Sequence, residues 1–135
     1  MRTSQFTEQQ LPRIAKLLGF EKEPKWLTIR FAIFISLSVD KKIDTSDKID
    51  FSDGKTYSLD VITGKGKVDL QGEQADYTDL IALMIANNEK ANINTQRGLE
   101  LKLEQHCERG FSILASSFNE NSDVFEWVKQ EFNSF

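Results

Sequence analysis

The stretch Trp26 to Val39, WLTIRFAIFISLSV, is the most apolar part of the 135-residue chain and limits its possible folds more than any other feature. Its odd positions from Leu27 to Val39 are apolar, which is the alternation of a strand, and its β-branched and aromatic content also favours one. A helix buried on most sides would have the same composition. Because Pro24 suits a first helical position, and so long a strand would exceed the usual three to ten residues, we predict a helix over Pro24–Val39.

A helix that is apolar nearly all round must be covered on most of its sides. A domain of this length has few elements with which to surround one helix. We therefore expect the same helix of other copies to supply the missing cover, as in intertwined dimers whose interface is also their core. The expected interface residues are Trp26, Leu27, Phe31, Phe34 and Ile35.

The remainder of the chain predicts one mainly α domain over residues 1–135. Helical spacing indicates a first helix that begins between Thr7 and Leu11 and ends at Gly19. Further helices are expected from Asp76, over Leu99–Phe118, and in a C-terminal extension, residues 119–135, capped by Ser122. Alternating apolar residues around TGKGK predict a small β-hairpin near residues 57–70.

Composition excludes several classes of protein. The chain has one cysteine, Cys107, and one histidine, His106, so an internal disulfide is impossible and a zinc site on one chain is unfavourable. The longest apolar run is shorter than the roughly 18 to 20 residues that cross a bilayer, and the N-terminal residues lack the apolar core of a secretory signal. We expect a cytoplasmic protein with no membrane partner, no metal and no cofactor.

The charge is unevenly distributed along the chain. The net charge is −4, yet residues 1–42 hold eight bases and four acids, so this part is +4 and the remainder is −8. This asymmetry suggests a basic face and an acidic face for two different partners. The bases are either ordinary surface charges or contacts for nucleic-acid phosphates, to which the N-terminal amides of the second helix would add. The candidate DNA-binding residues are Arg2, Arg13, Lys16, Lys22 and Lys25, with Lys65 and Lys67 from TGKGK.

The residues that suggest catalysis each have a simpler interpretation. His106 and Cys107 are neighbours, and neighbours on a helix point about 100° apart, so the pair cannot hydrogen-bond; Cys107 fits the apolar stripe of its helix as a core residue. TGKGK fails the P-loop pattern. The acidic line Glu100, Glu104 and Glu108 predicts a solvated helix face, or alternatively a docking surface for a basic partner. We predict no enzymatic activity.

The runs LPRIAKLLGF and WLTIRFAIFISLSV resemble the start of the DndE family of bacterial DNA phosphorothioation proteins. The matching framework residues are Leu11, Ile14 and Gly19, followed by Arg30, Phe31, Ala32 and Ile33. ITGKGKVDL, YTDLIALMI and LEQHCERGFSIL then occur in the family's order, so the resemblance covers about residues 7–118.

This resemblance implies a helical fold with a ribbon-helix-helix-like N-terminal part, assembled as a homo-oligomer, with a tetramer expected. It also implies a non-catalytic role in phosphorothioation. The chain would bind duplex DNA, preferring nicked duplex, beside a cysteine desulfurase and an ATP-using sulfur-transfer complex. Two alternatives stay open. One is an assembly adaptor that docks these enzymes through its acidic helix and C-terminal segment; the other is a ribbon-helix-helix transcription regulator that reads bases with residues near Arg2 to Gln5.

Overall fold

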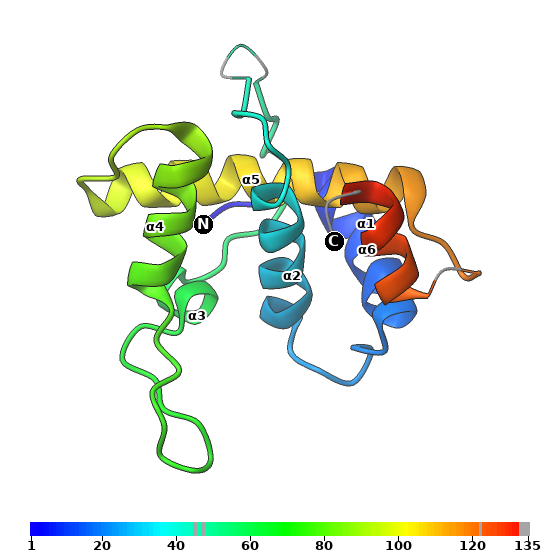
Figure 1. Ribbon diagram of the computed structural model, residues 1–135, viewed down its shortest axis with the longest axis horizontal. Coiled ribbons are helices and arrows are strands. Elements are labelled where there is room, and N and C mark those ends of the chain that lie inside the picture. Colours follow the sequence, from blue (N-terminus) through cyan, green and yellow to red (C-terminus); the bar gives the residue numbers. More distant parts are fainter. Residues whose placement is uncertain (45, 47, 122, 133–135) are drawn as a thin grey trace.

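The computed structural model describes residues 1–44, 46, 48–121 and 123–132. Over these residues the fold is almost entirely helical, as predicted, and its β structure is two isolated bridges, Arg2–Thr56 and Val68–Gln74. Figure 1 shows the arrangement of the helices, which are α1 (Gln5–Leu18), α2 (Lys25–Leu37), α3 (Leu59–Thr63), α4 (Thr78–Glu89), α5 (Gln96–Ser117) and α6 (Val124–Phe132).

The apolar run is a helix, which confirms the prediction. α2 starts one residue later than predicted, because Pro24 is its N-cap rather than its first helical residue, and it ends two residues earlier, at Leu37. Seven of its 13 residues are buried. α2 contacts α1, α3, α4 and α5, so helices of the same chain provide most of the cover that we expected from other copies.

The most extensive contact between two helices joins α2 to α5. α5 runs the length of the molecule, and α2 crosses it near its middle, with α4 on one side and α1 on the other (Figure 1). At the crossing, a Cβ placed on Gly110 would lie only 1.9 Å from the carbonyl oxygen of Ala32. Ala32 and Gly110 are both buried, so the absence of larger side chains lets the two backbones touch.

α1 begins earlier than predicted. Ser4 is its N-cap, and the Ser4 hydroxyl oxygen accepts a hydrogen bond from the Thr7 amide at 3.1 Å. Pro12 lies inside the helix, at an exposed position. The predicted end is confirmed, since Gly19 adopts φ = 79° as the C-cap.

The predicted hairpin near residues 57–70 is wrong. Leu59–Thr63 forms the short helix α3, which buries Ile62 and closes when the Gly64 amide donates to the carbonyl of Asp60 at 2.8 Å. Alternating apolar residues favoured a strand here, but a helical turn forms instead because it places Ile62 in the core. The chain reverses further on, in an arm formed by residues 64–76, which is joined by the Val68–Gln74 bridge and projects from the body (Figure 1).

The later helices follow the sequence pattern. α4 and α5 lie where helical spacing predicted them, and Thr95 caps α5 by accepting from the Gly98 amide at 2.9 Å. α6 packs through Trp127, whose ring centroid lies 5.3 Å from that of Phe118. The expected cap residue Ser122 lies outside the described residues. The ribbon-helix-helix likeness of the N-terminal part stays a prediction.

Candidate nucleic-acid interface

Three of the predicted DNA-binding residues line one cavity. Arg13 and Lys16 reach it from the last turns of α1, and Lys25 reaches it from the first turn of α2. The cavity has a volume of about 410 Å³, and Glu21 and Glu23 also line it. The turn between two helices therefore concentrates charges that are 12 residues apart in the sequence into one concave site.

Arg13 is held in place by the end of α5. Its guanidinium donates to the backbone carbonyls of Ala115 at 3.4 Å and Phe118 at 3.5 Å, and to the side-chain oxygen of Gln10 at 3.2 Å. None of these partners is a carboxylate, so within the described residues the positive charge of Arg13 is positioned but not neutralised. It remains exposed at the mouth of the cavity.

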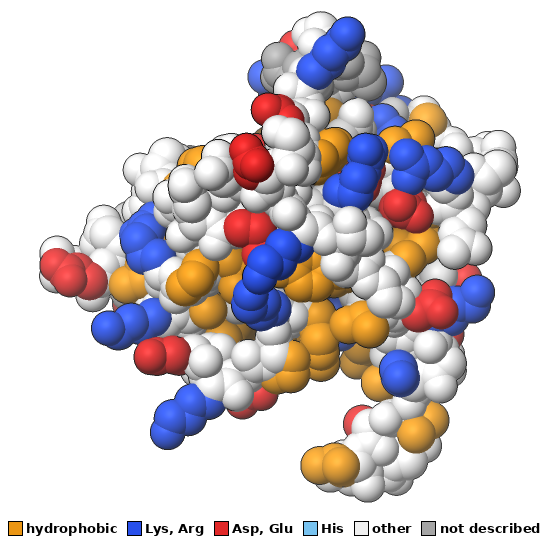
Figure 2. All heavy atoms as spheres, turned by 180° about the vertical axis from the view of Figure 1, so that it is seen from behind, with side chains coloured by type: hydrophobic (Ala, Val, Ile, Leu, Met, Phe, Trp, Pro, Cys, Tyr) orange, Lys and Arg blue, Asp and Glu red, His pale blue; other side chains and the backbone are white. Residues whose placement is uncertain are grey.

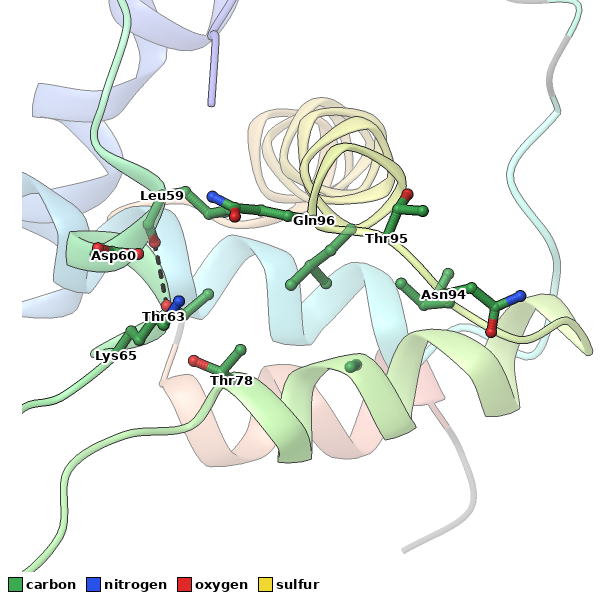
Figure 3. A pocket seen from close by; sticks show the side chains of 11 residues that line it. Leu59, Asp60, Thr63, Lys65, Thr78, Asn94, Thr95 and Gln96 are labelled. Atoms are coloured by element: carbon green, nitrogen blue, oxygen red, sulfur yellow. Dashed lines mark hydrogen bonds between the residues drawn. The ribbon is translucent and has the colours of Figure 1, made fainter.

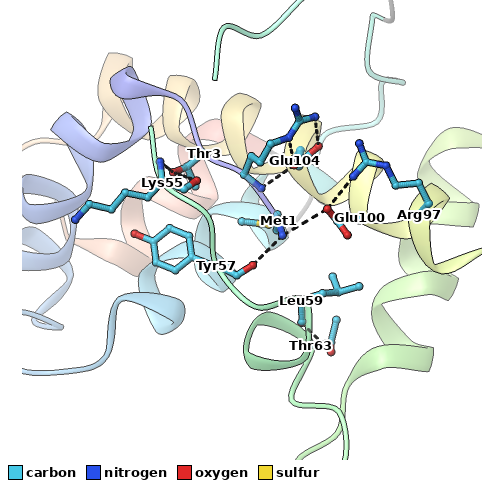
Figure 4. A network of polar contacts seen from close by, with 10 residues as sticks. Met1, Thr3, Lys55, Tyr57, Leu59, Thr63, Arg97, Glu100 and Glu104 are labelled. Atoms are coloured by element: carbon cyan, nitrogen blue, oxygen red, sulfur yellow. Dashed lines mark hydrogen bonds and ion pairs between the residues drawn. The ribbon is translucent and has the colours of Figure 1, made fainter. Parts of the chain in front are cut away.

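A further base, Lys55, joins this group and was missed from the sequence. Its ammonium lies beside that of Lys25 and, by hydrogen bonding and charge repulsion, holds the pKa of Lys25 below its usual value. Lys55 is brought there because its backbone carbonyl accepts from the Thr3 amide at 2.8 Å (Figure 4). Lys55 was not predicted because it lies in residues 43–135, the part of the sequence with a net charge of −8. Two adjacent lysines form a site that an anion would stabilise.

Arg2, by contrast, is used within the fold. Its Nε and Nη2 atoms donate to the two carboxylate oxygens of Glu104 at 2.9 and 3.1 Å, and its backbone amide donates to the same carboxylate at 2.7 Å. The guanidinium also lies over the ring of Phe51, 4.2 Å from the centroid. A phosphate would therefore have to compete with a bidentate carboxylate for this side chain.

The acidic line on α5 binds the chain's own N-terminal segment. Glu104 is 2% exposed and pairs with Arg2, so the expected solvated face is wrong for this residue. Glu108 accepts from the hydroxyls of Ser4 at 2.6 Å and Thr7 at 3.0 Å. Glu100 pairs with Arg97 at 2.8 Å (Figure 4). Little of this line is left free to dock a basic partner.

The remaining predicted DNA-binding residues are exposed but are not gathered at the α1–α2 cavity. Lys22 lies in the turn between α1 and α2, and Lys67 lies in the arm. Lys65 lines a different cavity of about 230 Å³ between α3, α4 and the start of α5, next to Asp60 and Thr63 (Figure 3). The structure therefore divides the seven predicted residues, and the single +4 segment does not form a single face.

Figure 2 shows one face of the molecule. On the face that it shows, basic side chains are interspersed with acidic ones, and hydrophobic side chains gather in the middle. The charge of each residue is known from the sequence, but how closely each base lies to an acid is not. The group of Arg13, Lys16, Lys25 and Lys55 holds four bases beside three acids, Glu21 and Glu23 of the cavity lining and Glu8, whose carboxylate lies 4.0 Å from the Lys55 ammonium.

A buried Ser-His-Glu chain lies apart from this group. Ser36 Oγ lies 2.8 Å from His106 Nδ1, and His106 Nε2 lies 3.1 Å from Glu89 Oε1. Ser36 and His106 are fully buried, and Ser36 Oγ also accepts from Arg109 Nε at 2.7 Å. Burial and the charge of Arg109 lower the pKa of His106 to about 4. A substrate cannot reach the Ser36 hydroxyl, so it cannot serve as a nucleophile. The three hydrogen-bonded side chains instead connect α2, α4 and α5.

Cys107 is a core residue, as predicted. It is 1% exposed, and burial raises the pKa of its thiol. In the described part of the chain, no cluster of three or more His, Cys, Asp or Glu residues could hold a metal ion. None of the helices described combines the length and apolarity that crossing a bilayer requires.

Comparison with known proteins places these features in one family. The family described as DNA sulphur modification protein DndE matches residues 1–122, which is nearly all of the 135-residue chain and includes the α1–α2 cavity. The match stops before α6. Searches of curated proteins and of solved structures found no match.

Proposed function

The chain belongs to the DndE family of DNA sulphur modification proteins, and from this premise we propose that it is a non-catalytic accessory protein that binds duplex DNA. The observation that carries DNA binding is the group of bases at the α1–α2 cavity, Arg13, Lys16 and Lys25 with the adjacent Lys55. Lysine and arginine side chains that are exposed and not neutralised bind phosphates without reading bases. The expected binding is therefore to the DNA backbone, without strong sequence preference.

A homo-oligomer, expected to be a tetramer, is part of this proposal. Trp26, Leu27, Phe31 and Phe34 of α2 are only partly covered in one chain, whereas Ile35 is 6% exposed and already lies in its own core. Leu83 of α4 is 66% exposed. Exposed apolar surface of this kind supports association, which would repeat the basic group at fixed spacing. The mass in solution tests this, and a single-chain mass at micromolar concentration would remove the oligomer from the proposal.

DNA binding is tested by reversing charges in the cavity. The Lys16→Glu, Lys25→Glu variant removes two expected phosphate contacts, so the slope of log affinity against log salt should become shallower by about 1.8. The measurement is fluorescence anisotropy with a labelled duplex, intact or nicked, at several salt concentrations. Unchanged affinity and slope would show that the α1–α2 cavity is not the DNA-binding surface.

Lys129→Glu is the matched control. Lys129 is an exposed lysine of α6, outside the family match, and pairs only weakly with Glu126 at 3.3 Å. The control reverses one lysine on the same chain, against two in the double variant, and it should change the salt slope by much less than half as much. A change half as large as that of the double variant would indicate a response to net charge alone.

An assembly adaptor remains the second candidate because of α6. Phe125 is 79% exposed on this helix, beyond the family match, and an exposed aromatic side chain can anchor a protein partner. The partners expected for it are the cysteine desulfurase and the ATP-using sulfur-transfer complex. If the chain binds no duplex at low salt, and Phe125→Ala abolishes co-purification with these enzymes, the adaptor is the better description.

The transcription regulator has the least support. Reading bases near Arg2 would require side chains that the fold already uses, since Arg2 pairs with Glu104 and Ser4 donates to Glu108. Equal affinity for unrelated duplex sequences would remove this alternative.

A further inference from the structure

We propose that the outer face of α4 binds the same face of a second copy of the chain, with the two helices antiparallel about a two-fold axis. This surface, the α4 face, is formed by Asp79, Leu80, Leu83, Ala86, Asn87 and the C-cap residue Lys90. It is separate from the α2 residues assigned to the proposed oligomer, so it is a second self-association surface and does not depend on DNA binding.

The middle of the α4 face is apolar and uncovered. α4 packs on the body of the molecule through Ile81 and Ile85, which are fully buried, whereas Leu80 is 49% exposed and Leu83 is 66% exposed. At 100° per residue, Leu83 lies about 160° around the helix from each of the two isoleucines. α4 also lies at one edge of the molecule (Figure 1). The core of its own chain therefore cannot cover Leu83.

The two ends of the α4 face carry opposite charges. Asp79 lies in the first turn of the helix and Lys90 is its C-cap, and both are exposed. Neither makes an ion pair within the residues that the structure describes. Eleven residues are close to three helical turns, so the two charges lie on the same side of α4, about 16 Å apart. Their signs also suit the dipole of α4, so it is the leucines between them that call for a partner.

A two-fold axis makes this face complementary to itself. When two copies of α4 run antiparallel with Asp79 of one beside Lys90 of the other, the symmetry forms the same pair again at the opposite end. In this register Leu83 faces Ala86 of the second copy, and a small residue opposite a large one lets two helices pack closely. A parallel arrangement would instead place Asp79 beside Asp79, so the charges select the antiparallel one.

A chain with two different self-complementary faces assembles beyond a dimer. The α2 residues of the proposed oligomer would form one two-fold contact, and the α4 face would form another. When two such axes are perpendicular, four copies close into a tetramer of dihedral symmetry. The α4 face supplies the second contact that such a tetramer requires. This step alone rests on the proposed function.

The test uses the variants Asp79→Lys and Lys90→Asp, with the mass in solution measured by light scattering over a range of concentrations. Each variant alone turns both opposite-charge pairs into like-charge pairs, so its association through α4 should be about tenfold weaker than that of the wild type. A tetramer should fall to half its mass. An equimolar mixture of the two variants should recover the wild-type association, because each chain then meets the opposite charge at both ends of the helix.

Leu83→Lys tests the apolar middle of the face. It places two ammonium groups in the centre of the contact, so association should weaken by about a hundredfold. Leu83 is 66% exposed, so the circular dichroism spectrum of the variant should stay that of the wild type. Phe125→Lys is the matched control, since it makes the same kind of change at a residue of α6 that is 79% exposed, and it should leave the mass unchanged.

The outcomes separate this inference from the proposed function. If Asp79→Lys and Leu83→Lys keep the wild-type mass, the α4 contact is overturned and an oligomer formed through α2 still stands. If the mixed charge variants associate no better than either variant alone, the antiparallel pairing is overturned. A wild-type mass of one chain would overturn the α4 contact and the proposed oligomer together. DNA binding is decided separately, by the Lys16→Glu, Lys25→Glu variant.

Discussion

Gly110→Ala should destabilise the fold, although alanine normally favours a helix. Gly110 lies inside α5, where α2 crosses it, and an added Cβ would lie 1.9 Å from the carbonyl oxygen of Ala32 and 2.5 Å from its carbonyl carbon. The obstructing atoms belong to the backbone of another helix, so no side chain can rotate away. The two helices would have to separate by about 1.5 Å to restore an ordinary contact of 3.4 Å.

The size of the effect follows from two opposing contributions. In a helix interior, alanine is better than glycine by about 0.5 to 1 kcal/mol. Overpacking a close-packed core costs about 1 to 3 kcal/mol, and a backbone collision belongs at or above the upper end. The net loss should be about 2 kcal/mol, equivalent to a fall in melting temperature of about 6 to 10 °C for a domain of this size.

Thermal and urea unfolding of the two variants Gly110→Ala and Gly98→Ala would measure this. Gly98 lies in the first turn of the same helix, and there the added Cβ meets only the side-chain oxygen of Thr95, at 3.0 Å. Gly98→Ala should therefore change the free energy of unfolding by less than about 1 kcal/mol. A Gly110→Ala variant as stable as the wild type would refute the close contact between α2 and α5.

Three other predictions concern the buried polar contacts and the terminal helix. Burial raises the pKa of Glu104, but hydrogen bonds from the side chain and backbone of Arg2, together with its charge, outweigh this and hold that pKa below its usual value. Glu104→Gln should therefore lower the free energy of unfolding by about 1 to 2 kcal/mol at pH 7, and by progressively less as the pH falls through the carboxyl range; a pH-independent difference in urea unfolding would contradict the pairing. His106 has a pKa of about 4 in the fold and an ordinary value of 6.5, so the unfolded chain binds more protons between these values, and stability should fall as the pH falls from 6.5 towards 4. Between pH 7.5 and pH 5 the wild type should lose about 2 kcal/mol more than His106→Gln, and equal losses would show that His106 does not titrate in this way. Trp127 is 4% exposed and donates from Nε1 to Ser117 Oγ at 3.0 Å, so Trp127→Ala should release α6 and expose residues 119–123 to limited proteolysis, while the melting of the remaining helices changes little.

How far the sequence predicted this fold depends on the range of each signal. The helical character of α2, the Gly19 cap and the spacing of α4 and α5 are visible within a few turns of chain, and each was confirmed. The hairpin was wrong because the sequence of residues 59–63 fits both an alternating strand and one helical turn. Only the burial of Ile62 in the folded core favours the helix. The early start of α1 was missed because its capping residue, Ser4, is also held by Glu108, 104 residues away.

The candidate site shows the same difference between local features, which the sequence predicts, and long-range contacts, which it does not. The sequence alone identified the basic residues of α1 and α2, and the resemblance identified the family. It could not show that Arg2 is paired with a carboxylate 102 residues away, or that Lys55 joins Lys25. It also could not show that the hydroxyl of Thr28, a residue of the cavity lining, has no hydrogen-bond partner among the residues that the structure describes.

The amino-acid sequence by itself therefore determined which of the longer segments are helical, that the longest apolar run needs cover on most of its sides, and which family the chain resembles. Only the tertiary structure decided what covers that run and which charges remain available to a ligand. The physical reason is that helix formation depends on neighbours within about four residues, whereas burial and charge pairing depend on residues that the sequence keeps far apart.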